Sequence, residues 1–382
     1  MTREAWRPGA GLAGGAKGDI DPAETGPRVG DRIGPYRLVR LLGEGASGRV
    51  FEVVHEKLGR RAAMKTLAAE HATHPGAIKR LFTEALAVNK INNPHIVEIT
   101  DLVEAGEHQL GRPAGTGAAP LASPVSAIVM ELLEGQSLGQ AITKEGPLEP
   151  ERFLPVLAQV CRALAAAHAA GFVHRDLKPD NIFLVAGGRD EDFVKLLDFG
   201  LTKPIRVEPT LSDTPLFATL DGTFVGTPGY VSPEQASGRA VDHRSDIYSV
   251  GVTLYELICG RLPFEALNLG ELLIQHVDTP APHLPDDVRA TRLGAVLAAI
   301  VQRCLEKDPA MRFPSASQLA TLFDKLAHGA EVTFTGVGAY LEDGAPPRPR
   351  TSRRETARAA VGVAVGLLLA LGLAVAVAHL RP

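Results

Sequence analysis

Three side chains that could perform chemistry on a phosphate stand close together at Asp176, Lys178 and Asn181. A carboxylate can orient a hydroxyl proton, an ammonium can neutralise a transferring phosphate, and an amide oxygen is a hard ligand suited to Mg²⁺. They follow the apolar stretch 153–169, which has helical character and ends near Gly171. We expect a buried helix to deliver the chain to an irregular loop on which the three side chains converge. The pattern predicts a phosphoryl-transfer site.

A second carboxylate that could hold the same metal is Asp198, in Asp198-Phe199-Gly200. This tripeptide alone is a common turn sequence. Here it follows an expected strand over 193–197, so Asp198 would supply the second oxygen ligand that Asn181 lacks. The predicted metal ligands are therefore Asn181 and Asp198.

Three glycines, Gly43, Gly45 and Gly48, separate two expected strands over 36–42 and 49–54. Glycines in a hairpin allow the backbone to approach a phosphate and to present N–H groups to it. A strand rather than a helix follows, which excludes the dinucleotide-binding fingerprint. From these residues alone, an ordinary glycine-rich turn remains an alternative.

Lys65 lies in the middle of the apolar strand expected over 60–67. Burying its charge without a partner would be costly. A partner is available in Glu84, on the apolar face of a helix expected over 77–91. For a helix standing alone, Glu84 would be a solvated surface charge, whereas with Lys65 upstream an ion pair is the better account.

In this order, the motifs resemble the protein kinase family over roughly residues 36–327. The resemblance implies ATP with Mg²⁺, or Mn²⁺ as an alternative, with Asp176, Lys178 and Asn181 catalytic and the Lys65–Glu84 pair gripping the phosphates. It also implies a nucleotide pocket that includes the hinge backbone between Glu131 and Leu133. The implied nucleotide-binding residues are Gly43, Gly45, Gly48, Val50, Ala63, Lys65, Glu84, Glu131, Leu133, Phe183 and Asp198.

The fold that the resemblance implies is α+β and bilobal: a small antiparallel β lobe with one helix above a larger, mainly helical lobe. The expected segments are a disordered leader (1–34), the kinase domain (35–328) with an insertion (105–126), a Pro/Arg-rich linker (329–358), a transmembrane helix (359–378) and a short external tail (379–382).

Two further expectations concern support of the catalytic loop. An apolar helix is expected over 246–259, with Gly260 as its stop. By resemblance, Asp246 accepts hydrogen bonds from backbone N–H groups of the loop, and Glu234 pairs with Arg312. The segment between Gly200 and Ser232 is rich in side-chain hydroxyls. The positions in it that are expected to be phosphorylated or to approach the substrate are Thr219, Thr223 and Thr227.

The stretch 359–378 contains no charged residue, and about 20 residues at about 1.5 Å each would cross a membrane core of about 30 Å. Arginines concentrate before it, which predicts a single-pass anchor in membrane lipid with the kinase domain in the cytoplasm. A buried terminal helix is the alternative. Gly362 and Gly366 form a small-xxx-small pair through which a homodimer could assemble.

The net charge of −4 gives no reason to expect nucleic-acid partners, and the cysteines Cys161, Cys259 and Cys304 are expected to be reduced. The expected function is transfer of the ATP γ-phosphate to Ser/Thr hydroxyls of protein substrates in bacterial signalling. Lys178 and Thr227 favour Ser/Thr over Tyr. The alternatives are a pseudokinase scaffold, disfavoured because no catalytic position is missing, and a small-molecule phosphotransferase, disfavoured by the segment around Glu234.

Overall fold

A computed structural model describes residues 26–45, 48–67, 85, 89–106, 109–111, 125–186, 192–198, 228–330 and 332. The helix expected around Glu84, the hydroxyl-rich segment with Thr219, Thr223 and Thr227, and the whole stretch 359–378 lie outside these residues. No helix in the described part of the chain is long and apolar enough to span a membrane.

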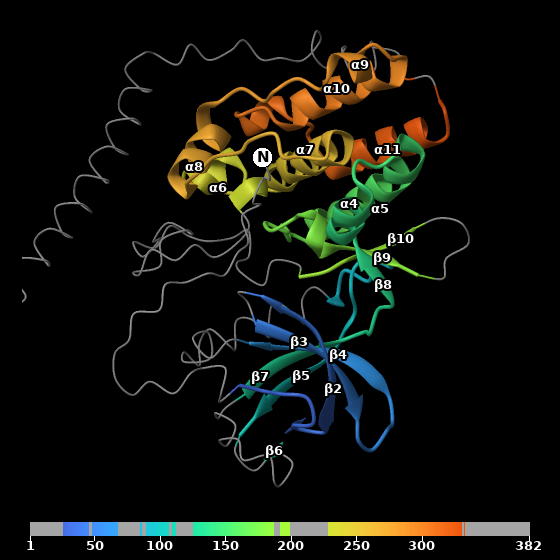
Figure 1. Cartoon of the computed structure of the whole chain (residues 1–382), viewed down its shortest axis with the longest axis vertical. Coiled ribbons are helices and arrows are strands. Elements are labelled where there is room, and N and C mark those ends of the chain that lie inside the picture. The colour runs from blue at the N-terminus through green and yellow to red at the C-terminus, as the bar shows by residue number, and fades with distance from the viewer. Residues whose placement is uncertain are drawn as a thin grey trace, which may run out of the picture. The chain divides into compact units, whose positions relative to one another are not determined.

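The first lobe is a seven-stranded sheet in the order β5-β7-β4-β3-β2-β1-β6, antiparallel at every pairing (Figure 1). Its strands are β1 (Arg32–Ile33), β2 (Tyr36–Gly45), β3 (Gly48–His55), β4 (Arg61–Leu67), β5 (Ile99–Ala105), β6 (Leu110–Gly111) and β7 (Val125–Met130).

Alternation of side chains along these strands builds one core. Leu38, Phe51, Val53, Met64 and Val129 are among the buried residues that pack together on one face of the sheet. Because β4 lies between β3 and β7, its residues are flanked on both sides, and this central place is where Ala63 and Lys65 fall.

The second lobe is mainly helical, with a small sheet of order β10-β9-β8 on one side (Figure 1). Its strands are β8 (Gly135–Ser137), β9 (Ile182–Val185) and β10 (Phe193–Leu196). The helices are α4 (Leu138–Glu145), α5 (Pro150–Ala169), α6 (Pro233–Ala236), α7 (Arg244–Cys259), α8 (Leu269–Asp278), α9 (Asp286–Arg289), α10 (Arg292–Cys304) and α11 (Ala316–Ala327).

The two central helices follow from their sequences. Helix α5 has Pro150 in its first turn and is buried along most of its length, with α11 packed beside it. Helix α7 ends at Gly260, whose left-handed φ of +66° suits a glycine at a helix C-terminus. Both were expected from the sequence, and together they hold the segment that carries Asp176.

Residues 26–34 of the expected leader (1–34) lie in the described part of the chain and include strand β1. Within the supposed leader, Ile33 is fully buried in strand β1, and Asp31 accepts a hydrogen bond from the backbone nitrogen of Arg28 at 2.9 Å. Strand β1 also pairs with β6, which lies inside the expected insertion. The high glycine content concealed this two-residue strand, since the pattern is too short to show a period.

Candidate active site

The loop that carries the catalytic candidates is held from below by Asp246 in α7. One carboxylate oxygen of Asp246 accepts from the backbone nitrogen of His174 at 2.8 Å and lies 2.7 Å from Nε2 of His168. The other oxygen accepts from the backbone nitrogen of Arg175 at 2.8 Å. Asp246 is fully buried, and burial acts to raise its pKa, but the hydrogen bond and charge of His168 lower the pKa below its usual value. The expected anchoring role of Asp246 is confirmed.

The loop turns sharply at Arg175, which has a left-handed φ of +65° although it is not glycine. Its carbonyl oxygen accepts from Nε2 of Gln235 in α6 at 2.8 Å. A backbone in this sparsely populated region persists only where its surroundings fix it. The hydrogen bonds that Asp246 accepts from this backbone and the one that Gln235 donates to it supply that support immediately before Asp176.

Asp176, Lys178 and Asn181 converge as predicted. Nζ of Lys178 lies 3.1 Å from Oδ2 of Asp176. Nδ2 of Asn181 donates to the carbonyl oxygen of Asp176 at 2.7 Å and to its Oδ2 at 3.1 Å. The Asp176 side chain remains 45% exposed, whereas Asn181 is buried. A carboxylate with fixed neighbours therefore faces solvent, where a substrate hydroxyl could reach it.

Asp198 and Lys65 form the second cluster. Nζ of Lys65 donates to Oδ2 of Asp198 at 2.7 Å. The Lys65 side chain is almost entirely buried, while that of Asp198 is 36% exposed. Asp198, two residues after the end of β10, also has a left-handed φ of +48°, a conformation that a residue other than glycine rarely adopts. The structure thus pairs Lys65 with Asp198, and the predicted Lys65–Glu84 pair lies outside the described residues because Glu84 does.

Hydrogen bonds join the two segments that carry the predicted metal ligands. The nitrogen of Leu197 donates to the carbonyl oxygen of Asn181 at 2.9 Å, and Nε2 of His174 lies 3.1 Å from the carbonyl oxygen of Leu197. The residue before Asp198 is therefore bound to Asn181 itself and to the start of the catalytic loop.

These residues fit a divalent cation of the Mg²⁺ type. With Nδ2 of Asn181 engaged by Asp176, its Oδ1 is the atom left to act as a ligand, and Asp198 offers carboxylate oxygens. In the described part of the chain, no group of three or more His, Cys, Asp or Glu side chains could enclose a metal. A site of two protein oxygens suits Mg²⁺, which in nucleotide enzymes takes its other ligands from phosphates and water.

The residues predicted to contact a nucleotide line neighbouring strands. In the hairpin, Gly43 pairs with Val50 and Gly45 with Gly48, whose φ of +132° disfavours side chains. Val50 in turn pairs with Lys65.

On the other flank of β4, Ala63 pairs with Met130 at the end of β7. The hinge segment with Glu131 and Leu133 follows directly, and the backbone nitrogen of Glu131 donates to the carbonyl oxygen of Glu98 at 3.0 Å. Phe183 stands in β9, half-buried, opposite Lys195.

A buried ion pair supports the loop from a second side. The two terminal guanidinium nitrogens of Arg312, Nη1 and Nη2, each donate to Glu234 at 2.8 Å, and both side chains are almost completely buried. Burial acts to raise the pKa of Glu234, but the hydrogen bonds and charge of Arg312 lower it below its usual value. The predicted Glu234–Arg312 pair is confirmed.

Sequence reasoning missed two contacts of the site. His168, in the last turn of α5, reaches Asp246, and Lys195 in β10 reaches Glu131 at 2.6 Å. A polar side chain at an otherwise buried helical position was a signal for His168. Lys195 carried no such signal, because charges alternate with apolar residues in many half-exposed strands.

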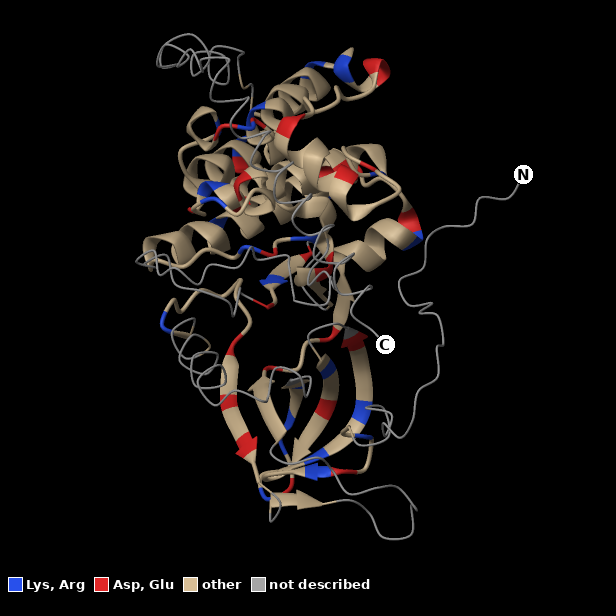
Figure 2. Cartoon of the chain, turned by 90° about the vertical axis from the view of Figure 1, so that its left-hand side faces the viewer, with Lys and Arg blue, Asp and Glu red and all other residues tan. Residues whose placement is uncertain are grey.

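Charged residues of both signs are mixed along the chain. Figure 2 shows Lys and Arg interspersed with Asp and Glu along both the strands and the helices, with no region of one sign dominating the view. The cysteines Cys161, Cys259 and Cys304 are free thiols, with Cys161 and Cys304 buried. Burial raises the pKa of both buried thiols, which leaves the chemistry of the site to its carboxylates, lysines and amide.

Comparison with known proteins gives one consistent result. The family model for the protein kinase domain matches residues 36–323. Serine/threonine-protein kinase Pkn1 of Myxococcus xanthus is 39% identical over 343 residues, 88% of this chain and 45% of that protein. Serine/threonine-protein kinase PknA of Mycobacterium tuberculosis is 36% identical over 295 residues, 77% of this chain and 62% of that protein. The chain thus spans less than two thirds of these relatives.

Solved structures agree on the fold. The crystal structure of the PknI kinase domain of Mycobacterium tuberculosis matches with a TM-score of 0.55 at 24% sequence identity, over 80% of this chain and 100% of that one. A likeness at this identity concerns the two-lobed architecture alone.

Proposed function

The chain belongs to the protein kinase family, and from this premise we propose that it transfers the γ-phosphate of ATP to Ser and Thr hydroxyls of proteins. One observation carries the proposal. The exposed carboxylate of Asp176 lies within 3.1 Å of both Lys178 and Asn181, on a loop whose backbone is fixed by Asp246. Such a carboxylate can orient a hydroxyl for attack, and the adjacent ammonium can offset charge on the transferring group.

Each side chain has one task in this proposal. Mg-ATP would supply the transferable phosphoryl group and the electrophilic cation. Asn181 and Asp198 hold the cation, Lys65 neutralises phosphate charge, and Asp176 orients the substrate hydroxyl while Lys178 stabilises developing charge. The hairpin glycines Gly43, Gly45 and Gly48 provide backbone N–H groups to the phosphates. Val50, Ala63, Phe183 and the hinge at Glu131 and Leu133 would enclose the base.

Ser/Thr rather than Tyr is supported by Lys178 within the catalytic loop, and the relatives named above are Ser/Thr kinases. The turn Pro228–Tyr230 and helix α6 lie directly after the hydroxyl-rich segment, and α6 touches the catalytic loop through Gln235. A protein segment approaching Asp176 would meet this surface. Autophosphorylation at Thr219 or Thr223, with Thr227 near the substrate, belongs to the same proposal.

Anchoring at a membrane is a further part of the proposal. It is supported by the uncharged stretch 359–378 and by the arginines at 348, 350, 353, 354 and 358 that precede it. The kinase domain would then work at the cytoplasmic face, and Gly362 with Gly366 could pair two copies. Sedimentation of the full chain with membranes, lost on deletion of 359–378, tests this part. A deletion variant that still sediments with membranes contradicts it.

The activity is tested with γ-labelled ATP, the full chain and a generic basic protein, followed by phosphoamino acid analysis. We expect label on Ser and Thr that is lost in Asp176→Asn. Binding of Mg-ATP without any transfer, by wild type and variant alike, would instead favour the pseudokinase scaffold. Label on Tyr alone would contradict the assignment to Ser/Thr.

A further inference from the structure

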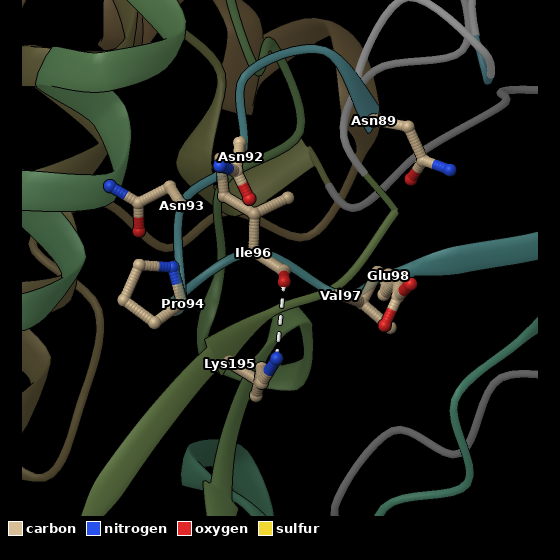
Figure 3. Close-up of a pocket in the computed structure, with 8 residues that line it drawn as sticks. All are labelled: Asn89, Asn92, Asn93, Pro94, Ile96, Val97, Glu98 and Lys195. Carbon is tan, nitrogen blue, oxygen red and sulfur yellow. Dashed lines mark hydrogen bonds between the residues drawn. The ribbon is translucent and has the colours of Figure 1, made fainter.

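A cavity of about 320 Å³ lies beside the loop before β5, and one of its walls is the side chain of Lys195 (Figure 3). Other lining residues are Asn89, Asn92, Asn93, Ile96 and Glu98. Nζ of Lys195 donates to the carbonyl oxygen of Ile96 at 3.3 Å, the bond drawn in Figure 3, and to Oε1 of Glu131 at 2.6 Å. Lys195 is therefore directed from β10 toward the hinge.

Glu131 is tied in turn to the first lobe. Its Oε1 also accepts from the backbone nitrogen of Glu98 at 2.8 Å, and its own backbone nitrogen donates to the Glu98 carbonyl oxygen at 3.0 Å. One carboxylate oxygen thus receives both Lys195 and Glu98. The orientation of the first hinge residue depends on this shared oxygen, because backbone and side chain are held at the same partner.

The backbone that follows Lys195 leads to the predicted metal ligands. The residue after Lys195, Leu196, donates its backbone nitrogen to the His95 carbonyl oxygen at 2.7 Å and accepts from the nitrogen of Val97 at 3.0 Å. Leu197 is bound to Asn181, and Asp198 follows. Two residues of β10 and its extension therefore separate the hinge contact from Asp198.

We propose that Lys195 is a positioning residue that sets the distance between the adenine-binding hinge and Asp198 through its bond to Glu131. This rests on the proposed function, since it requires that ATP bind with its base at the hinge and its phosphates near Asp198. A nucleotide that contacts both the hinge and Asp198 binds more tightly when the two are already held at the right distance, because binding then costs less conformational entropy. A nucleoside without phosphates touches only the hinge and gains nothing from the link.

The same geometry argues against a role in stability alone. The side chains of Lys195 and Glu131 are 15% and 25% exposed, so neither is sealed from water, and the partner left by a substitution can still be hydrated in part. The cavity beside Lys195 leaves room for an uncharged side chain of the same length. The Lys195→Met variant should therefore fold normally but lack the hydrogen bond to Glu131 in the hinge.

The test measures binding of Mg-ATP and of adenosine by calorimetry to the full chain, so that it does not depend on transfer. In Lys195→Met and in Glu131→Gln we expect the Kd for Mg-ATP to rise about 3- to 10-fold, while the Kd for adenosine changes less than about 2-fold. The double variant should be no worse than the single ones, because both remove the same link.

Arg289→Met, which breaks the exposed Arg289–Asp286 pair in α9, is the matched control and should change neither Kd. An unchanged Kd for Mg-ATP in Lys195→Met would overturn the proposal, as would an equal loss of Mg-ATP and adenosine affinity. Failure of the proposed function shows differently: wild type would bind Mg-ATP but transfer no phosphate.

Discussion

The carboxylates on the two sides of the catalytic loop differ in how deeply they are buried. On the helical side, Asp246 and Glu234 are buried and each is held by at least two hydrogen-bond donors from other elements. On the opposite, open side of the loop, Asp176 and Asp198 are 45% and 36% exposed. The first pair is shielded from substrate, and the second is open to it.

This difference separates architecture from chemistry. A buried carboxylate without its partners would leave an uncompensated charge, so the helical side must remain fully paired. A half-exposed carboxylate can exchange its partner for a hydroxyl or a cation at small cost, because water screens it meanwhile. Substitutions of the buried residues on the helical side should therefore destabilise the fold. Substitutions of the exposed carboxylates should abolish phosphoryl transfer in a protein that still folds.

The largest expected loss of stability comes from Arg312→Met. It leaves Glu234 buried with only Ser245 as a side-chain partner and removes bonds to the carbonyl oxygens of Glu306 and Arg244. We expect a fall of about 3–5 kcal/mol in the free energy of unfolding, measured by urea denaturation. The control Arg162→Met removes the exposed ion pair with Asp324 and should cost at most about 1 kcal/mol. Similar losses of stability in both variants would contradict the expected difference between the buried and the exposed ion pair.

On the open side of the loop, where Lys65 contacts Asp198, Lys65→Met should reduce phosphoryl transfer by about 10²- to 10³-fold, because a buried cation directed at the phosphates is lost. Stability should change by less than about 1 kcal/mol, since the partner Asp198 is exposed enough to be hydrated. Initial rates with saturating protein substrate and a thermal melt of the same sample check both. A variant that melts far lower would place Lys65 with the architectural residues instead.

A smaller loss of stability is expected for Asp246→Asn. The amide retains one oxygen acceptor for the backbone nitrogens of His174 and Arg175 and loses the charge that faces His168. Loss of one buried acceptor should cost about 1–3 kcal/mol. Transfer should fall as well, because the loop below Asp176 loosens. Unchanged stability in urea would show that the loop does not depend on this anchor.

The smallest effect is a pH dependence on the helical side. His276 in α8 is fully buried, and burial lowers its pKa to about 3, with the nearby charge of Lys307 contributing. The unfolded chain takes up a proton there below about pH 6.5, so it binds more protons than the folded protein and stability falls as the pH drops.

Between pH 6.5 and 5 the slope from His276 should approach about 1.4 kcal/mol per pH unit at most. Nδ1 of His276 lies 3.0 Å from the hydroxyl of Tyr248. His276→Gln keeps a polar partner for Tyr248 but cannot take up the proton, so it should reduce this slope. The lowered pKa values of Asp246 and Glu234 act in a separate window, since their stabilisation is present above about pH 4 and is lost at lower pH. An identical slope in the variant would rule out His276 as its source.

Much of this organisation could be predicted from sequence because it is local or strongly patterned. Helices α5 and α7, the strand before Asp198, and the Asp246 and Glu234–Arg312 contacts agree with expectation. The contacts that were missed link elements distant in the chain without a distinctive residue pattern. Strand β1 pairs with β6 from the far side of a long connection, and the Lys195–Glu131 bond depends on how two lobes meet.

The partner of Lys65 illustrates the same limit. A buried lysine must be paired, which the strand pattern indicated correctly, but the pattern did not name Asp198 as a partner. In the structure its ammonium is bound to Asp198. Because Asp198 is also a proposed cation ligand, this contact concerns the binding of Mg-ATP as well as the packing of β4.

The most direct test compares Asp176→Asn with wild type, measuring phosphoryl transfer and the free energy of unfolding on the same full-length preparation. Asp176 lies on the open side of the loop, so we expect transfer to fall by about 10²- to 10⁴-fold while stability changes by less than about 1 kcal/mol. Retained transfer would contradict the assignment of Asp176, and a large loss of stability would contradict the separation between the two sides of the loop.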